Sequence, residues 1–230
     1  SQIRTKEQFI DYVSEKLEIE KGELDDYCSN EDILAEQYGL NSENFMTLIV
    51  PATYEVNWTT HINDLFSLLE KSYDEVWTKA KKEKVKSLGY NIPEIVTLAS
   101  IVQSESGIKT EQQKIAGVYI NRLKQDMRLQ ADPTVVFANG DFDVQRVLSA
   151  DKEIDSPYNT YRYKGLPPGP ICLVNPSVID AVLNYTKHNY TYFCAKADFS
   201  GYSNFTNDYK VHMKNAAAYQ EALNKKGIKR

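Results

Sequence analysis

The chain has 230 residues, enough for one large domain or for a small domain followed by a mid-sized one, each with a substantial core. Its formal net charge of −5 and isoelectric point near 5.4 argue against the basic surface that nucleic acid or anionic lipid requires, so we expect neither as a partner. No hydrophobic run is long enough to span a bilayer, and the chain opens with the polar segment SQIRTKEQF. We therefore expect a soluble protein, or one whose N-terminal membrane anchor is not included in this chain.

The residue composition also limits the chemistry. Sixteen Tyr stand against eight Phe and two Trp, which suits a cleft that stacks on sugars but is equally typical of sheets and surfaces. The cysteines and histidines lie far apart, with no pair at metal-ligand spacing, so we expect no disulfide framework, no metal site and no cofactor. They are Cys28, Cys172, Cys194, His61, His188 and His212.

The first part of the chain predicts mainly helices. Thr5 is a plausible N-cap for a helix whose apolar stripe contains Phe9, Ile10, Val13 and Leu17. Shorter helical patterns follow in 30–40 and 41–50, and an extended turn or short strand is expected around Pro51. Residues 57–89 then predict a single long helix that ends at the glycine at 89.

The pattern changes after residue 90. Asn91 and Glu94 have the spacing of a capping box, and Pro93 falls in the first turn of that helix. Thr110 is the expected cap of a second helix, with Ile115, Val118, Tyr119 and Leu123 facing inward. Loops and short strands are expected in 127–138, 156–171 and 189–205, and a last helix in 211–227. We therefore predict an α+β fold: a mainly helical support region over 1–90 and a mixed helix and short-strand catalytic domain over 91–230.

Glu105 stands out because it follows an apolar helix pattern, in the stretch LASIVQSESG. At about 100° per residue, Leu98 and Val102 lie on one stripe and Glu105 falls on its flank. A carboxyl group against apolar neighbours resists ionisation, so its pKa rises toward the value that a general acid needs near neutral pH. Periodicity alone fits a glutamate at a solvated helix end equally well.

Two later segments carry polar groups on stiff backbone. Gln130 and Asp132 precede Pro133 in a turn-like segment, which is also the pattern of an ordinary Asp-Pro turn. In SPYNTYRYKGLPPGPI, the aromatic and amide side chains suit carbohydrate, and the prolines suit either a cleft wall or a connector. The candidate residues of this second segment are Tyr158, Asn159, Thr160 and Tyr161.

Five segments in this order resemble the endolytic murein transglycosylases of the YceG-like (MltG) family. They are LASIVQSES, IAGVYINRL, MRLQADPTVVFA, SPYNTYRYKGLPPGPI and FSGYSNFTNDYKVHMKNAAAYQ, and they cover most of residues 91–230. The family has two carboxylates in the first segment, of which the second, catalytic one matches Glu105. Gln103 replaces the first, and a glutamine cannot give up a proton.

The resemblance implies a lyase that cleaves the β-1,4 bond between N-acetylmuramic acid and N-acetylglucosamine and leaves 1,6-anhydromuramoyl ends. Glu105 would act first as acid and then as base. By resemblance, the substrate-binding or glutamate-orienting residues are Gln130, Asp132, Tyr158, Asn159, Tyr161 and His212. Because hydrolases of glycosidic bonds usually employ two carboxylates, Asp132 keeps a hydrolytic muramidase open as an alternative, and a non-catalytic glycan-binding scaffold is a further one.

The resemblance also bears on partners and location. It implies glycan strands of peptidoglycan as substrate, peptidoglycan synthases as possible partners, and a place at the cell envelope, on the periplasmic side of the inner membrane. Family members usually carry a transmembrane anchor and a LysM-like region, so residues 1–90 are interpreted as support and remnant of that module. Ala52 stands where the family commonly has an aspartate, so any role of that aspartate is absent here or supplied elsewhere.

Overall fold

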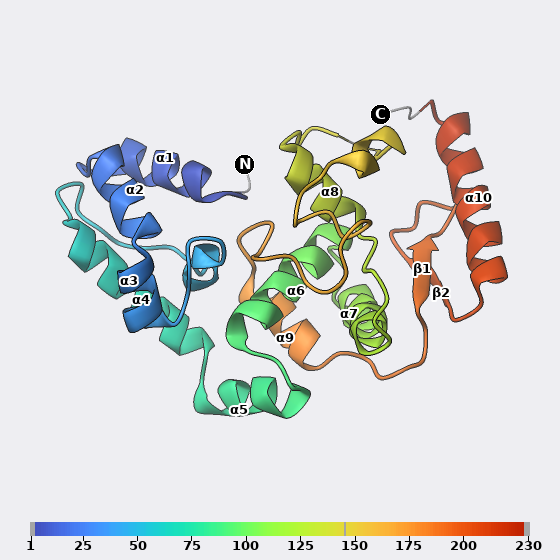
Figure 1. The fold of residues 1–230 in the computed structure, drawn as a ribbon, viewed down its shortest axis with the longest axis horizontal. Coiled ribbons are helices and arrows are strands. Elements are labelled where there is room, and N and C mark those ends of the chain that lie inside the picture. Colours follow the sequence, from blue (N-terminus) through green and yellow to red (C-terminus); the bar gives the residue numbers. More distant parts are fainter. Residues whose placement is uncertain (1–2, 145, 228–230) are drawn as a thin grey trace. The chain divides into compact units, whose positions relative to one another are not determined.

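The computed structural model describes residues 3–144 and 146–227, and it is mostly helical with one small two-stranded sheet (Figure 1). The chain divides into two compact units. One contains residues 1–100 and 168–179, and the other contains residues 101–167 and 180–230. The sequence instead predicts two domains that meet at residue 90, and that boundary stays a prediction.

The N-terminal unit is built from short helices around an apolar core. Its elements are α1 (Lys6–Lys16), α2 (Lys21–Ser29), α3 (Glu31–Ile33), the π-helical turn η1 (Leu34–Tyr38), the 3₁₀ turn η2 (Phe45–Leu48), α4 (Ile62–Val76) and α5 (Lys79–Leu88). The stripe predicted for the first helix is buried, and Thr5 caps that helix by accepting a hydrogen bond of 3.2 Å from the backbone N–H of Gln8. Phe9 and Phe45 meet in the core beside Phe66.

The single long helix predicted over 57–89 is wrong, because the chain breaks between α4 and α5. Trp77 turns into the interior, where only 2% of it is exposed, and Thr78 begins the next helix by capping the N–H of Lys81. Gly89 ends α5 as predicted, in a left-handed conformation with φ of 81°. The pattern in 41–50 gives only the turn η2, and the segment around Pro51 forms neither helix nor strand.

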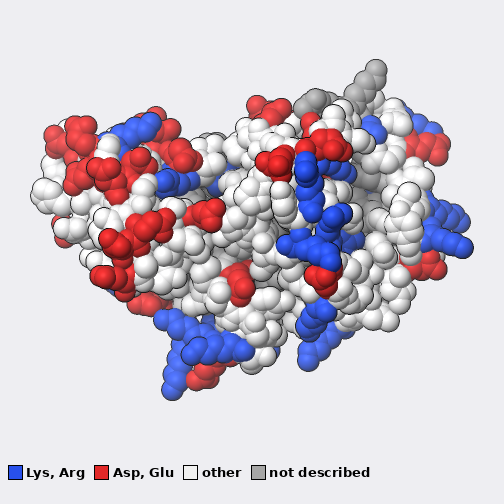
Figure 2. Space-filling view, viewed as in Figure 1, with Lys and Arg blue, Asp and Glu red and all other residues white. Residues whose placement is uncertain are grey.

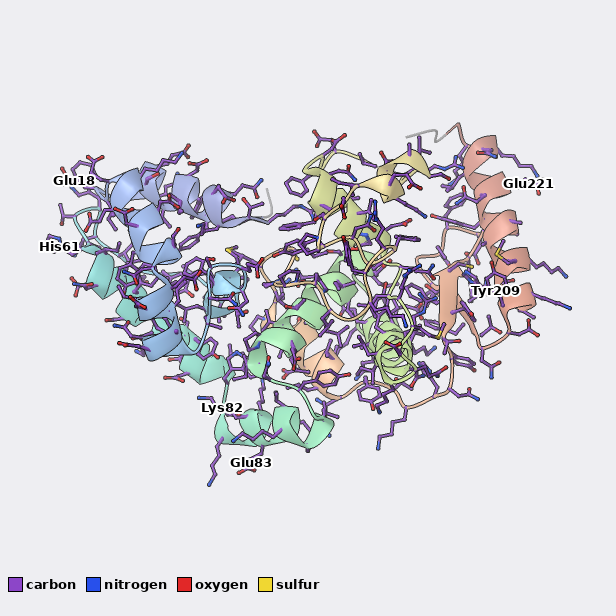
Figure 3. All side chains as sticks on the ribbon, in the orientation of Figure 1. Glu18, His61, Lys82, Glu83, Tyr209 and Glu221 are labelled. Carbon is purple, nitrogen blue, oxygen red and sulfur yellow. The ribbon has the colours of Figure 1, made fainter. Side chains whose placement is uncertain are left out.

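Lysines gather over α5, where Figure 2 shows a cluster of positive side chains and Figure 3 shows Lys82 and Glu83 on the same helix. Only Val85 of α5 is buried. No helix in the described part of the chain is long and apolar enough to cross a membrane.

The helix α6 (Ile92–Glu105) begins with the predicted capping box and ends on the candidate acid. The backbone N–H of Asn91 donates to Glu94 Oε2 at 2.8 Å, and the N–H of Glu94 donates to Asn91 Oδ1 at 2.9 Å. The helix is buried from Ile95 through Val102, so its last turn carries the polar residues from a packed interior into the candidate site.

The second unit contains α7 (Lys109–Lys124), which contacts a hairpin, and α8 (Asp132–Asn139), which contacts the short helical turn η3 (Ala150–Glu153). Its other elements are β1 (Tyr192–Ala195), β2 (Ser203–Thr206) and α10 (Tyr209–Lys225), while α9 (Pro176–Leu183) runs across the division between the units. The strands are antiparallel, with Tyr192 opposite Thr206, and α10 packs along them (Figure 1).

Two sequence predictions fail in this unit. Residues 127–138 were expected as loop and short strand, but Asp132 begins α8, with Pro133 in the first turn where a missing N–H is tolerated. Thr110 was expected to cap the second helix, but Ile108 occupies the cap position and Thr110 lies inside the first turn. The short strands predicted in 189–205 are present as β1 and β2, and the last helix is α10, so helices with a small sheet are confirmed. Strands in 127–138 and 156–171 are not found.

Candidate active site

Glu105 is the last residue of α6, and its carboxyl group is partly buried. Tyr119 of α7 donates a hydrogen bond of 2.6 Å from its hydroxyl to Glu105 Oε1. Burial raises the pKa of Glu105 to about 7, the charge of Asp132 acts in the same direction, and the Tyr119 hydrogen bond and the charge of Arg122 act against it. A carboxyl group with this pKa is protonated in part of the molecules at neutral pH, as a general acid requires.

Tyr119 is held in place by the hairpin. Its side chain is only 1% exposed, and Phe193 of β1 meets its ring edge-on with 5.7 Å between the ring centres. Sequence reasoning placed Tyr119 on the inward face of its helix but did not recognise it as a partner of Glu105. The available signal was a hydroxyl on an otherwise apolar helix face, because a buried Tyr hydroxyl needs a hydrogen-bond partner.

Arg122 lies one turn further along α7 and is 6% exposed. Its guanidinium donates from Nε to the carbonyl of Thr191 at 2.6 Å and from Nη1 to the carbonyl of Leu129 at 2.6 Å. It also lies over the ring of Tyr192, 5.3 Å from the ring centre. A buried cation bound to these carbonyls joins the hairpin to the segment before Asp132, and it places positive charge near Glu105.

Asp132 and Tyr161, predicted from separate segments, are brought together. The Tyr161 hydroxyl donates to Asp132 Oδ1 at 2.6 Å, and Lys152 Nζ lies 3.3 Å from the same oxygen. Burial first, and then the charge of Asp132, raise the pKa of Tyr161 above its usual range, so this hydroxyl keeps its proton. The charge of Asp132 also acts on Glu105, which places the two carboxylates in one electrostatic environment.

The backbone around Asp132 is fixed by Thr160. Thr160 Oγ1 accepts from the N–H of Ala131 at 3.0 Å, and its carbonyl accepts from the N–H of Gln130 at 3.1 Å. Gln130 takes a left-handed conformation with φ of 52°, and its exposed side chain has Oε1 at 3.5 Å from Arg122 Nη1. The segment around Gln130 and the segment around Thr160, which were predicted separately, are therefore hydrogen-bonded to each other and form one continuous part of the candidate site.

Asn159 and Tyr158 differ in their surroundings from the residues at the carboxylates. Asn159 is fully buried, and its amide donates to the carbonyls of Lys152 at 2.9 Å and Ile154 at 2.8 Å. Its Oδ1 accepts from the N–H of Tyr161 at 3.0 Å. The ring of Tyr158 lies 4.7 Å from that of Phe137. These contacts fix the conformation of the loop around residues 154–161. The role of Tyr158 and Asn159 in substrate binding stays a prediction.

His212 of α10 stacks on Tyr192, with 5.1 Å between the ring centres and 23° between the planes. Its Nδ1 is buried and has no hydrogen-bond partner among the described residues. Burial first, and then the charge of Arg122, lower the pKa of His212, which favours a neutral imidazole. Tyr209, labelled in Figure 3, completes a group of three rings and is 58% exposed.

No group of three or more His, Cys, Asp or Glu that could hold a metal ion occurs among residues 3–144 and 146–227.

Comparison with known proteins agrees with this fold. The model of the YceG-like family matches residues 1–218, so the chain belongs to the YceG-like family. A crystal structure of a yceG-like protein from Listeria monocytogenes superposes with a TM-score of 0.76 at 27% identity, covering 93% of this chain and 74% of that one.

Two curated relatives carry the name endolytic murein transglycosylase. The one from Bacillus subtilis is 40% identical over 183 residues, which is 77% of this chain and 49% of the relative. The one from Streptococcus pneumoniae is 34% identical over 176 residues, which is 74% of this chain and 31% of the relative. The alignments thus span half or less of the length of these relatives.

Proposed function

We propose that this chain is the catalytic part of an endolytic murein transglycosylase at the cell envelope, with the glycan strands of peptidoglycan as substrate. Membership of the YceG-like family and the names of the relatives support the substrate class. The single observation that carries the catalytic part of the proposal is Glu105, a partly buried carboxyl group with a pKa of about 7 and a hydrogen bond to Tyr119.

The proposed reaction cleaves the β-1,4 bond between N-acetylmuramic acid and N-acetylglucosamine. Protonated Glu105 gives its proton to the glycosidic oxygen, and the bond from that oxygen to C1 of the muramoyl residue breaks. The Glu105 carboxylate then takes the proton of the muramoyl C6 hydroxyl as O6 bonds to C1. The products are a 1,6-anhydromuramoyl end and a free 4-hydroxyl on N-acetylglucosamine, and Glu105 regains its proton.

This cycle needs one proton-carrying carboxyl group, whereas a hydrolase needs a second carboxylate for water or for a covalent intermediate. Asp132 is the candidate for the second carboxylate of a hydrolase, because its charge acts on Glu105. Its Oδ1 already accepts from Tyr161 and lies beside Lys152, which supports a binding or orienting role over a nucleophilic one. We assign Asp132 and Tyr161 to the cleft wall, with Gln130 and His212 as further substrate-facing groups.

Digestion of purified glycan strands followed by mass spectrometry of the products tests the proposal. We expect 1,6-anhydromuramoyl ends on fragments cut within the strand. Reducing muramic acid ends would establish a hydrolytic muramidase instead. Strands that bind but remain uncut, with wild type and Glu105→Gln alike, would establish a glycan-binding scaffold.

A further inference from the structure

Lys152 belongs to the candidate site although no sequence motif marks it. Its ammonium group lies 3.0 Å from the Tyr161 hydroxyl and 3.3 Å from Asp132 Oδ1, and it sits 4.1 Å from the centre of the Tyr161 ring. An ammonium group can only donate, so the Tyr161 oxygen accepts a hydrogen bond from Lys152, and the Tyr161 hydroxyl donates its own hydrogen bond to Asp132. The three side chains form a closed triangle in which Asp132 has only acceptor roles.

Hydrogen bonds to the backbone fix the position of Lys152. The buried side-chain amide of Asn159 donates to the carbonyl of Lys152 and accepts from the N–H of Tyr161, so this one side chain positions the backbone of both Lys152 and Tyr161. Asn139 of α8 donates to the carbonyl of Asp151 at 3.1 Å, which ties η3 to the helix that Asp132 begins. The Lys152 side chain is 30% exposed, less than that of Asp132 at 51%.

A negative charge near a carboxyl group disfavours its ionisation, and the charge of Asp132 raises the pKa of Glu105 in this way. A cation paired with Asp132 offsets part of that charge. The ammonium group of Lys152 lies 3.3 Å from Asp132 Oδ1 and pairs with it directly.

We propose that Lys152 is a positioning residue of the site: its ammonium group holds the Asp132 carboxylate and the Tyr161 hydroxyl together in the cleft wall and offsets the negative charge that Asp132 exerts on Glu105. This inference rests on the proposed function of the site. Lys152 acts through Asp132 and Tyr161, and it does not itself exchange a proton with the substrate.

The charged and titratable groups around these two carboxyl groups come from three elements and the loop before residue 167. They are Tyr119 and Arg122 of α7, Asp132 of α8, Lys152 of η3 and Tyr161 of the loop. The charge of Arg122 also acts on His212 of α10. Of the positive charges, Arg122 is committed to backbone carbonyls. The charge of Lys152 is paired directly with Asp132.

The test measures the Glu105 titration without any substrate. The full chain, labelled with ¹³C at the Glu carboxyl carbon, is titrated by NMR, and the Glu105 signal is assigned by its loss in Glu105→Gln. In Lys152→Met the charge of Asp132 is no longer compensated, so we expect the Glu105 midpoint to rise by about one pH unit. Lys152→Arg restores a cation and should return the midpoint to within about 0.3 unit of wild type. Lys187→Met, at an exposed lysine outside the site, should leave it unchanged.

An unchanged Glu105 midpoint in Lys152→Met would overturn the inference, and a lower melting temperature alone would then assign Lys152 a structural role. The same variants are assayed on glycan strands across pH, where the alkaline limb of kcat/KM should move up with the NMR midpoint in Lys152→Met and return in Lys152→Arg. If the midpoint moves but no variant and no wild type cuts glycan, the proposed function fails while the role of Lys152 in the carboxyl pair stands.

Discussion

The hydroxyl of Tyr119 donates a hydrogen bond of 2.6 Å to Oε1 of Glu105, from a side chain that is itself almost completely buried. This bond favours the ionised carboxylate and therefore opposes the effect of burial. The balance of the two leaves the pKa of Glu105 at about 7 instead of higher.

Replacing Tyr119 by Phe removes this bond and keeps the ring against Phe193. The pKa of Glu105 should then rise further above 7, so the alkaline limb of kcat/KM moves to higher pH, by about one unit. The maximal rate should fall because the carboxyl group loses an anchor. Tyr12→Phe, at an exposed tyrosine of α1, is the matched control. A pH profile identical to wild type would contradict the assigned role of Tyr119.

Glu105→Gln tests the acid directly. Glutamine keeps the shape and can still accept from Tyr119 but carries no transferable proton, so turnover of glycan strands should fall by about 10²–10⁴-fold. Binding of the strands, measured by co-sedimentation or fluorescence anisotropy, should stay within about threefold of wild type. Asp132→Asn is the companion variant. A loss of turnover in Asp132→Asn as large as in Glu105→Gln would favour a two-carboxylate mechanism.

Glu105 should also affect stability in a pH-dependent way. Its folded-state pKa, about 7, is raised above the ordinary value of 4.5, so the stabilising contribution of the protonated group is complete below about 4.5 and is lost as pH rises through 7. Glu105→Gln lacks this titration. Its free energy of unfolding should exceed that of wild type by about 1–3 kcal/mol at about pH 8, and the difference should shrink toward about pH 5. Denaturant unfolding at the two pH values measures it. If the stability difference between Glu105→Gln and wild type instead grew toward acid pH, the raised pKa of Glu105 would be contradicted.

His212 should titrate below an ordinary histidine. Burial and the charge of Arg122 lower its pKa, so the folded state binds fewer protons than the unfolded chain, and stability declines as pH falls below the unfolded value of about 6.5. NMR of the His212 ring protons, with the urea-unfolded chain as reference, measures the midpoint. A midpoint above the reference would show that an anion outweighs Arg122 at this ring.

Gly117 is predicted to tolerate no side chain. A Cβ at this position would lie 2.5 Å from the carbonyl oxygen of Thr186 and 2.7 Å from His188 Nε2, whereas one at Gly22 in α2 would meet nothing within 4 Å. Gly117→Ala should destabilise the fold by about 1–3 kcal/mol, and Gly22→Ala should change stability by less than about 1 kcal/mol. Thermal unfolding of the pair measures both. Equal melting temperatures would show that the 186–188 segment moves aside without cost.

The local parts of the fold could be predicted from the sequence. The capping box of Asn91 and Glu94 and the stop at Gly89 depend on neighbouring residues alone, and the structure contains both. The position of Glu105 beside an apolar stripe also followed from helical periodicity, and with it the direction of its pKa.

The rest depended on contacts between distant residues. The break at Trp77 occurs because that ring is buried in the interior, although the surrounding lysines and glutamates favour a continuous helix. Lys152 lies in a segment without a recognisable pattern, and only the loop that Asn159 holds brings it to Asp132. Asp132 was interpreted as part of a turn because it precedes a proline, yet that proline fits the first turn of α8.

The edge-on contact between Phe193 and Tyr119 gives the small sheet an importance beyond its size. A pair of strands has almost no interior of its own, so what it contributes is the support of other elements. Here it supports the ring whose hydroxyl lowers the pKa of Glu105 against the effect of burial. A substitution in the hairpin is therefore expected to change the acidity of Glu105 through the Tyr119 ring, although the hairpin is separate in sequence from the helix that carries the carboxyl group.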